Sequence, residues 1–148
     1  MMARITIMRG LPGSGKSTYI HKFLGNAEVF SADNFHMVNG VHRYNPNNIS
    51  LAHNECLYQY ISATFVEKKN NFVVDNTNTT LVELAPYVRI AEALNIAYEI
   101  VYLPCDPAVA MKRNTHSVPA NTILKMYANL TTEIVPTYWK QTVIFSNY

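Results

Sequence analysis

The fold of this chain is decided by residues 10–17, which read Gly10-Leu11-Pro12-Gly13-Ser14-Gly15-Lys16-Ser17. They fit the pattern G-x-x-x-x-G-K-[ST], whose glycines let the backbone curl so that successive N–H groups point at phosphate oxygens. A β-branched, alternating run at residues 4–8 predicts a strand before the loop, and residues 16–24 predict a helix after it. The helix N-terminus adds a positive dipole to such a loop. We therefore predict a site for ATP or GTP with Mg²⁺.

Three side chains at the end of this loop have specific expected roles. Lys16 is expected to reach the β- and γ-phosphates, Ser17 to offer its hydroxyl to Mg²⁺, and Thr18 to contact the α-phosphate. The alternative is an ordinary glycine-rich turn. It has little support, because the pattern arises by chance in a chain of this length on the order of once in a few hundred.

Predicted strands and helices alternate along the rest of the chain. Further strands are expected at residues 28–31, 72–75, 96–103 and 142–145, and further helices at 46–69, 81–91, 106–114 and 119–135. Pro86 is expected to kink its helix, and Asp106 with Pro107 reads as an N-cap and N1 pair. The alternation predicts an α/β fold of the three-layer P-loop NTPase, nucleotide-kinase-like type, with a five-stranded parallel sheet. Ligands of such sheets bind at the carboxyl ends of the strands.

Length and composition agree with a single domain over residues 1–148, built around the P-loop. Hydrophobic residues make up 49% of the chain, enough to bury a core without disulfides or structural metal. Cys56 and Cys105 lie far apart and outside any metal-ligand spacing, which favours a reducing compartment. No apolar run is long enough for a membrane span and no signal peptide is seen, so a cytoplasmic location is expected. A net charge of +2 neither requires nor excludes a nucleic-acid partner.

Two predicted strands end in carboxylates. Asp33 follows the second strand, where a carboxylate can take the proton of an acceptor hydroxyl; the alternative is a simple turn cap. Asp75 ends the third strand, where it can hold Mg²⁺ directly or through water. Thr77 and Asn78 would then face the acceptor. The alternative for this segment is a turn made of the usual turn residues.

A polar segment at about residues 113–119 is expected to form a short lid. Arg113 ends the helix before it, and an arginine delivered from a lid can neutralise the charge on a transferring phosphoryl group. The alternative is a cation that complements the dipole at the C-terminal end of the helix.

A looser polar cluster follows the second predicted strand, where an acceptor phosphate or base would bind. Its members are His36, His42, Arg43, Tyr44 and His53. Solvated loop residues are the alternative interpretation of this cluster. Its histidines have no spacing typical of a metal site.

The order of these motifs resembles the kinase domain of phage polynucleotide kinase. It is closer still in pattern to the polynucleotide-kinase-like domains of certain animal ubiquitin-ligase-binding proteins. The residues that carry the resemblance are 10–18, 31–33, 74–78, 112–114 and 118–119, so nearly the whole chain is covered. The loop is generic to P-loop proteins, whereas the other segments in this order are more specific.

The resemblance implies transfer of the γ-phosphate of ATP to the 5′-hydroxyl of DNA or RNA ends, in nucleic-acid repair and, for a phage protein, in the host cytoplasm. It implies that Asp33 is the general base and that Arg113 stabilises the transferring group. Three residues after its base, the phage enzyme has an arginine that binds a 3′-phosphate, and His36 stands there in this chain. The acceptor is therefore left open. The alternatives are a small hydroxyl-bearing metabolite or nucleoside as acceptor, or a binding module regulated by nucleotide.

Overall fold

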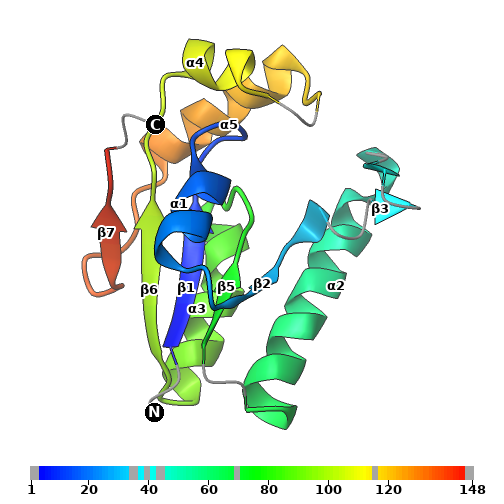
Figure 1. Cartoon of the computed structure of the whole chain (residues 1–148). Helices are drawn as coiled ribbons and strands as arrows, with labels where there is room; N and C mark the ends of the chain where they lie inside the picture. Colours follow the sequence, from blue (N-terminus) through cyan, green and yellow to red (C-terminus); the bar gives the residue numbers. More distant parts are fainter. Residues whose placement is uncertain are drawn as a thin grey trace.

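A five-stranded parallel sheet, in the strand order β2-β5-β1-β6-β7, organises the fold (Figure 1). Its strands are β1 (Arg4–Arg9), β2 (Glu28–Phe30), β5 (Asn71–Val74), β6 (Ala97–Tyr102) and β7 (Gln141–Val143). The computed structural model describes residues 4–33, 37–38, 41–42, 46–68, 71–114 and 117–145. Every pairing in this sheet is parallel, so all the strands end at one edge. The prediction of an α/β fold with five parallel strands is confirmed.

Helices cover both faces of the sheet and its carboxyl edge. They are α1 (Lys16–Phe23), α2 (Ile49–Ile61), α3 (Leu81–Ala93), α4 (Pro107–Lys112) and α5 (Ala120–Thr132). On one face α1 packs through Ile20 against Met8 and Val101, whereas α2 and α3 pack on the other face. Above the carboxyl ends of the strands lie α4 and α5 (Figure 1).

The central strands β1 and β5 are buried over most of their length because both faces of the sheet are covered. In β1, Ile5 and Ile7 pack toward α2 and α3, and Met8 packs toward α1. All three side chains are fully buried, and each contributes about 1.5–3 kcal/mol to stability through burial. These rigid strands fix the positions of the residues that follow them at the carboxyl edge.

Several predicted helices differ in detail from those observed. The helix expected at 46–69 is a 3₁₀ turn (Pro46–Asn48), then α2, then a π-helical turn (Ser62–Val66). Pro86 lies inside α3, which continues as one helix on both sides of it. At α4, Asp106 accepts a hydrogen bond from the N–H of Ala108 at 2.7 Å and Pro107 follows it, so the predicted N-cap pair is confirmed.

A small antiparallel sheet joins β3 (Met37–Val38) to β4 (Val41–His42). The sequence pattern did not predict this hairpin, because each strand has two residues and shows no period of its own. It lies near the N-terminal end of α2 (Figure 1).

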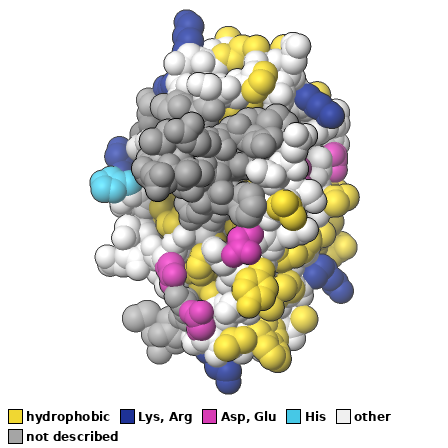
Figure 2. All heavy atoms as spheres, turned by 90° about the vertical axis from the view of Figure 1, so that its right-hand side faces the viewer, with side chains coloured by type: hydrophobic (Ala, Val, Ile, Leu, Met, Phe, Trp, Pro, Cys, Tyr) yellow, Lys and Arg dark blue, Asp and Glu magenta, His cyan; other side chains and the backbone are white. Residues whose placement is uncertain are grey.

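Figure 2 shows the α2 side of the molecule, where hydrophobic side chains are exposed among polar ones. The exposed large side chains on α2 and the π-helical turn include Leu51, Tyr58, Ile61 and Phe65. Within the described residues, no helix combines the length and the apolar character that a membrane crossing requires.

Candidate active site

The loop after β1 has the backbone that its sequence predicts. Gly13 and Gly15 have φ angles of 81° and 100°, in the left-handed region that glycine adopts without strain. Gly15 is also the N-cap of α1, so the helix begins directly at the loop. The Oγ atom of Ser14 is buried and has no hydrogen-bond partner among the described residues. A curled backbone at a helix N-terminus, with an unpaired buried hydroxyl inside it, fits the phosphates of a nucleotide.

The ammonium group of Lys16 lies over this loop. Its Nζ donates hydrogen bonds to the carbonyl oxygens of Gly10 and Leu11, at 3.0 and 2.8 Å. Burial lowers the pKa of Lys16, and the carboxylates of Asp75 and Asp33 oppose that shift. Both predicted carboxylates are thus close enough to the loop lysine to influence its pKa.

The ends of β2 and β5 are tied together beside the loop. The N–H of Asp75 donates to the carbonyl oxygen of Phe30 at 2.7 Å. One residue further on, the N–H of Ala32 donates to Oδ1 of Asn76 at 2.8 Å. The turn that carries Asp33 is also closed locally, because the N–H of Asp33 donates to Oγ of Ser31 at 3.1 Å.

Ser17 and Asp75 line the same open cavity, of about 290 Å³, between α1 and the edge of the sheet at β2. Ile20 and His21 of α1, and Leu24 directly after it, also line this cavity. Hydroxyl and carboxylate oxygens are ligands that suit Mg²⁺. The two residues predicted to hold this ion thus face one space, as the chemistry requires.

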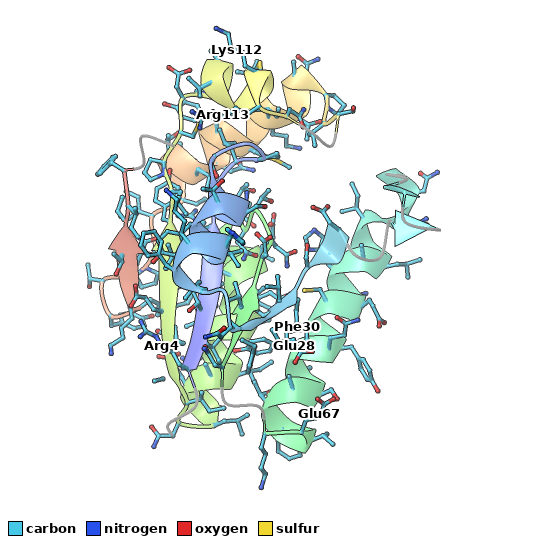
Figure 3. All side chains as sticks on the ribbon, viewed as in Figure 1. Arg4, Glu28, Phe30, Glu67, Lys112 and Arg113 are labelled. Carbon is cyan, nitrogen blue, oxygen red and sulfur yellow. The ribbon has the colours of Figure 1, made fainter. Side chains whose placement is uncertain are left out.

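Arg113 follows α4 directly beside the loop. A Cβ atom built on Gly13 would lie 3.2 Å from Cβ of Arg113 and 2.6 Å from the carbonyl oxygen of Ala110, so α4 contacts the loop closely. Figure 3 shows Arg113 on the loop side of α4, while Lys112 points away from the molecule. Burial raises the pKa of Cys105, and the charge of Arg113 opposes this shift.

The segment expected to form a lid is closed by its own side chain. Nδ2 of Asn114 donates to the carbonyl oxygen of Val118 at 2.7 Å, which joins the two ends of the segment. Residues 115–116 in its middle lie outside the described part of the chain.

Thr77 and Asn78 are both bonded to the end of β1. The carbonyl oxygen of Thr77 accepts a hydrogen bond from the N–H of Gly10 at 2.9 Å. Asn78 is 1% exposed, and its Nδ2 donates to the carbonyl oxygen of Met8 at 2.8 Å. Its side chain therefore points into the fold, in contrast to the acceptor-facing placement expected from the sequence. The left-handed backbone at Asn78, with φ of 46°, produces this orientation.

Most of the polar cluster expected after β2 lies outside the described residues. His36, Arg43 and Tyr44 are not among the residues that the structure describes. The backbone of His42 pairs with that of Met37 in the hairpin, and His53 lies on α2.

Arg9, the last residue of β1, is a residue of the site that sequence reasoning missed. It is 2% exposed, and its guanidinium donates to the carbonyl oxygens of Asn78, Thr79 and Glu133 at 2.9, 3.0 and 2.9 Å. It also lies 5.4 Å from the ring centre of Tyr102. The signal available in the sequence was a charged residue directly after the apolar pair Ile7 and Met8, at the end of the strand.

The sheet order, the phosphate-binding loop and the helices at the carboxyl edge together define a P-loop kinase-like α/β fold. Residues 5–129 match the AAA domain family AAA_33, and the chain belongs to that family. Human NEDD4-binding protein 2 is 27% identical over an alignment of 132 residues, and the match covers 82% of this chain and 7% of that protein. The chain therefore spans a small part of that relative.

Solved structures share the same fold. A sugar kinase from Janibacter sp. superposes with a TM-score of 0.66 at 17% identity, covering 98% of this chain and 86% of its own. A chain of the Pnkp1/Rnl/Hen1 complex superposes with a TM-score of 0.59 at 21% identity, covering 80% of this chain and 41% of its own. At these identities the likeness establishes the fold.

Proposed function

We propose that this chain is an ATP-dependent phosphotransferase, with the 5′-hydroxyl end of DNA or RNA as its acceptor. One observation carries the proposal: the ammonium of Lys16 lies on the phosphate-binding loop, and the strand ends that carry Asp33 and Asp75 are hydrogen-bonded to each other beside it. A phosphoryl-transfer site needs a cation for the phosphates, a metal ligand and a base close together. These residues supply all three.

Each residue has a role that follows from its place. Residues 10–18 bind the triphosphate of ATP, and Lys16 neutralises charge on its β- and γ-phosphates. Ser17 and Asp75 hold Mg²⁺, which when bound supplies positive charge against the phosphates. Asp33 takes the proton of the acceptor hydroxyl, and Arg113 stabilises the charge on the transferring group.

The polynucleotide acceptor is supported by the resemblance to polynucleotide kinases. Asp33, Asp75 and Arg113 of this chain stand in the order of the motifs of that family. The membership of the chain in AAA_33 and its similarity to NEDD4-binding protein 2 agree with this pattern. His36 and Thr77 are proposed as acceptor contacts. Asn78 acts at this site through its backbone bond to Arg9.

The test is a transfer assay with ATP labelled at the γ-phosphate and 5′-hydroxyl DNA and RNA of several lengths, with GTP as a parallel donor. Wild type should label the oligonucleotides, and Lys16→Ala should not. Asp33→Asn should lower kcat by about 10²–10⁴-fold, because general-base catalysis contributes that much. Glu67→Gln, an exposed carboxylate beyond the π-helical turn, is the matched control. Absence of label with every oligonucleotide, together with unchanged ATP turnover in Asp33→Asn, would overturn the proposal.

A small hydroxyl-bearing metabolite or nucleoside is the second candidate acceptor. It is favoured by the superposition on a sugar kinase over 98% of the chain. Salt dependence separates the two, because an acceptor held through several phosphates binds more weakly as salt rises. A kcat/KM for the acceptor that does not change with salt would favour the metabolite.

A further inference from the structure

The amide side chain of Asn76 joins three elements behind the proposed active site. It is 6% exposed. Its Oδ1 accepts a hydrogen bond from the N–H of Ala32 at 2.8 Å, and its Nδ2 donates to Sγ of Cys56, on α2, at 3.4 Å. Ala32 directly precedes Asp33, and Asn76 directly follows Asp75. A single side chain therefore connects the end of β2, the end of β5 and α2.

The surroundings of Asn76 hold its amide in one orientation. Cys56 and Tyr87, two of the buried side chains around it, are 1% and 4% exposed. Burial raises the pKa of both groups, so both are neutral. The buried N–H of Ala32 needs an acceptor, and Oδ1 is the atom of the amide that can accept. Oδ1 must therefore face Ala32.

The hydrogen bond between Ala32 and Asn76 connects the turn that carries Asp33 to a residue outside that turn. The bond between Asp33 N–H and Ser31 Oγ is local to the turn and does not link it to β5. The bond between Asp75 N–H and the carbonyl oxygen of Phe30 links the strands before the turn begins. The Asn76 bond is formed within the turn, one residue from Asp33.

We propose that Asn76 is a positioning residue that fixes the turn carrying Asp33 relative to Asp75. The inference rests on the proposed function, in which Asp33 is the base and Asp75 holds Mg²⁺. Removing the amide leaves the N–H of Ala32 buried without a partner and frees the turn to shift. A shift of about 1 Å between reacting groups can cost on the order of 10²-fold in rate.

The experiment compares wild type, Asn76→Ala and Cys56→Ala in two measurements. In the transfer assay, Asn76→Ala should lower kcat by about 10–10²-fold with the KM for ATP little changed, because the phosphate-binding loop is untouched. Cys56→Ala keeps the bond to Ala32 and should retain a kcat close to that of wild type. Amide hydrogen exchange followed by NMR should show protection of the Ala32 N–H in wild type and Cys56→Ala, and loss of it in Asn76→Ala.

The outcomes separate the positioning role from the proposed function. If wild type transfers phosphate and Asn76→Ala keeps the wild-type kcat, the positioning role alone is overturned. The same holds if the Ala32 amide of Asn76→Ala stays protected from exchange. A wild-type chain that transfers phosphate to no acceptor overturns the proposed function and, with it, this inference. An equal loss of ATP affinity and of kcat indicates a general structural defect and also overturns the positioning role. If Asn76→Ala does not fold, Asn76→Ser replaces it, since its shorter side chain does not reach Ala32.

Discussion

At the scale of single residues, Gly13 shows how closely the phosphate-binding loop and α4 are packed. Its φ of 81° is costly for any other residue, and an added Cβ would lie 2.6 Å from the carbonyl oxygen of Ala110. We expect Gly13→Ala to destabilise the fold by at least about 1–2 kcal/mol from the backbone strain alone. Urea denaturation measures this loss. Gly25→Ala is the control, because its nearest neighbour would be the His21 carbonyl oxygen at 3.2 Å, and it should lose less. Equal losses would contradict the steric explanation.

Tyr60 makes the stability of the chain sensitive to high pH. Its ring is fully buried and its hydroxyl donates to the carbonyl oxygen of Tyr87 at 2.7 Å. Burial raises the pKa of Tyr60 above its ordinary value near 10. Below pH 10 both folded and unfolded states keep the proton. Above it the unfolded chain ionises first, so the free energy of unfolding falls by up to about 1.4 kcal/mol per pH unit for this group.

Urea denaturation between about pH 8 and about pH 11, a range that spans the ordinary tyrosine pKa near 10, tests this dependence. Tyr60→Phe should be less stable at neutral pH and lose less stability as pH rises, whereas Tyr58→Phe, an exposed control, should follow wild type. A Tyr60→Phe curve parallel to that of wild type would show that this tyrosine ionises alike in both states.

The site residues whose positions are best predicted from the sequence are those that belong to a motif with a defined backbone position. Asp75 is placed by the end of β5, and Lys16 and Ser17 are placed by the N-terminus of α1. The residues that surround them therefore follow from the order of the strands in the sheet. Asn78 could not be oriented from sequence, because its direction goes with a left-handed φ and with a hydrogen bond to the carbonyl oxygen of Met8, 70 residues away in the chain. The roles of all these side chains stay predictions until the variants are assayed.

At the scale of elements, α3 depends on the residue before its first turn. Oγ1 of Thr80 accepts a hydrogen bond from the N–H of Glu83 at 3.2 Å and caps the helix. Thr80→Ala should therefore destabilise the fold by about 1 kcal/mol, measured by denaturation. Thr131→Ala is the control, since that exposed hydroxyl bonds to carbonyl groups of its own helix, and it should stay within about 0.5 kcal/mol of wild type. Equal effects would show that the cap contributes nothing specific.

Elements with a strong period were predictable, and elements fixed by tertiary contact were not. The central strands β1 and β5 were found because they are buried over most of their length, which gives runs rich in apolar residues. The π-helical turn Ser62–Val66 has no sequence signal of its own, so it was absorbed into one long predicted helix. The same holds for the short hairpin of β3 and β4.

At the scale of the whole molecule, Arg9 joins segments that are far apart in the chain. Its guanidinium links β1 to Asn78 and Thr79 on one side and to Glu133, after α5, on the other. Arg9→Met would leave these carbonyl groups without their donor, at about 1–3 kcal/mol for each group that stays buried. We expect a loss of more than about 2 kcal/mol in the free energy of unfolding, measured in urea.

Arg4→Met is the matched control in the same strand. Arg4 is exposed, and its ion pair with Glu99 at 3.2 Å is worth about 0–1 kcal/mol. A loss in Arg9→Met no larger than that in Arg4→Met would contradict the linking role of Arg9.

The bond between Arg9 and Glu133 also holds the C-terminal end of α5 on the strand beneath it. A helix of 13 residues is roughly 20 Å long, so a rotation of about 10° around that end would move the other end by roughly 3–4 Å. Any such rotation would be largest at Ala120, the end of α5 that follows the segment expected to form a lid.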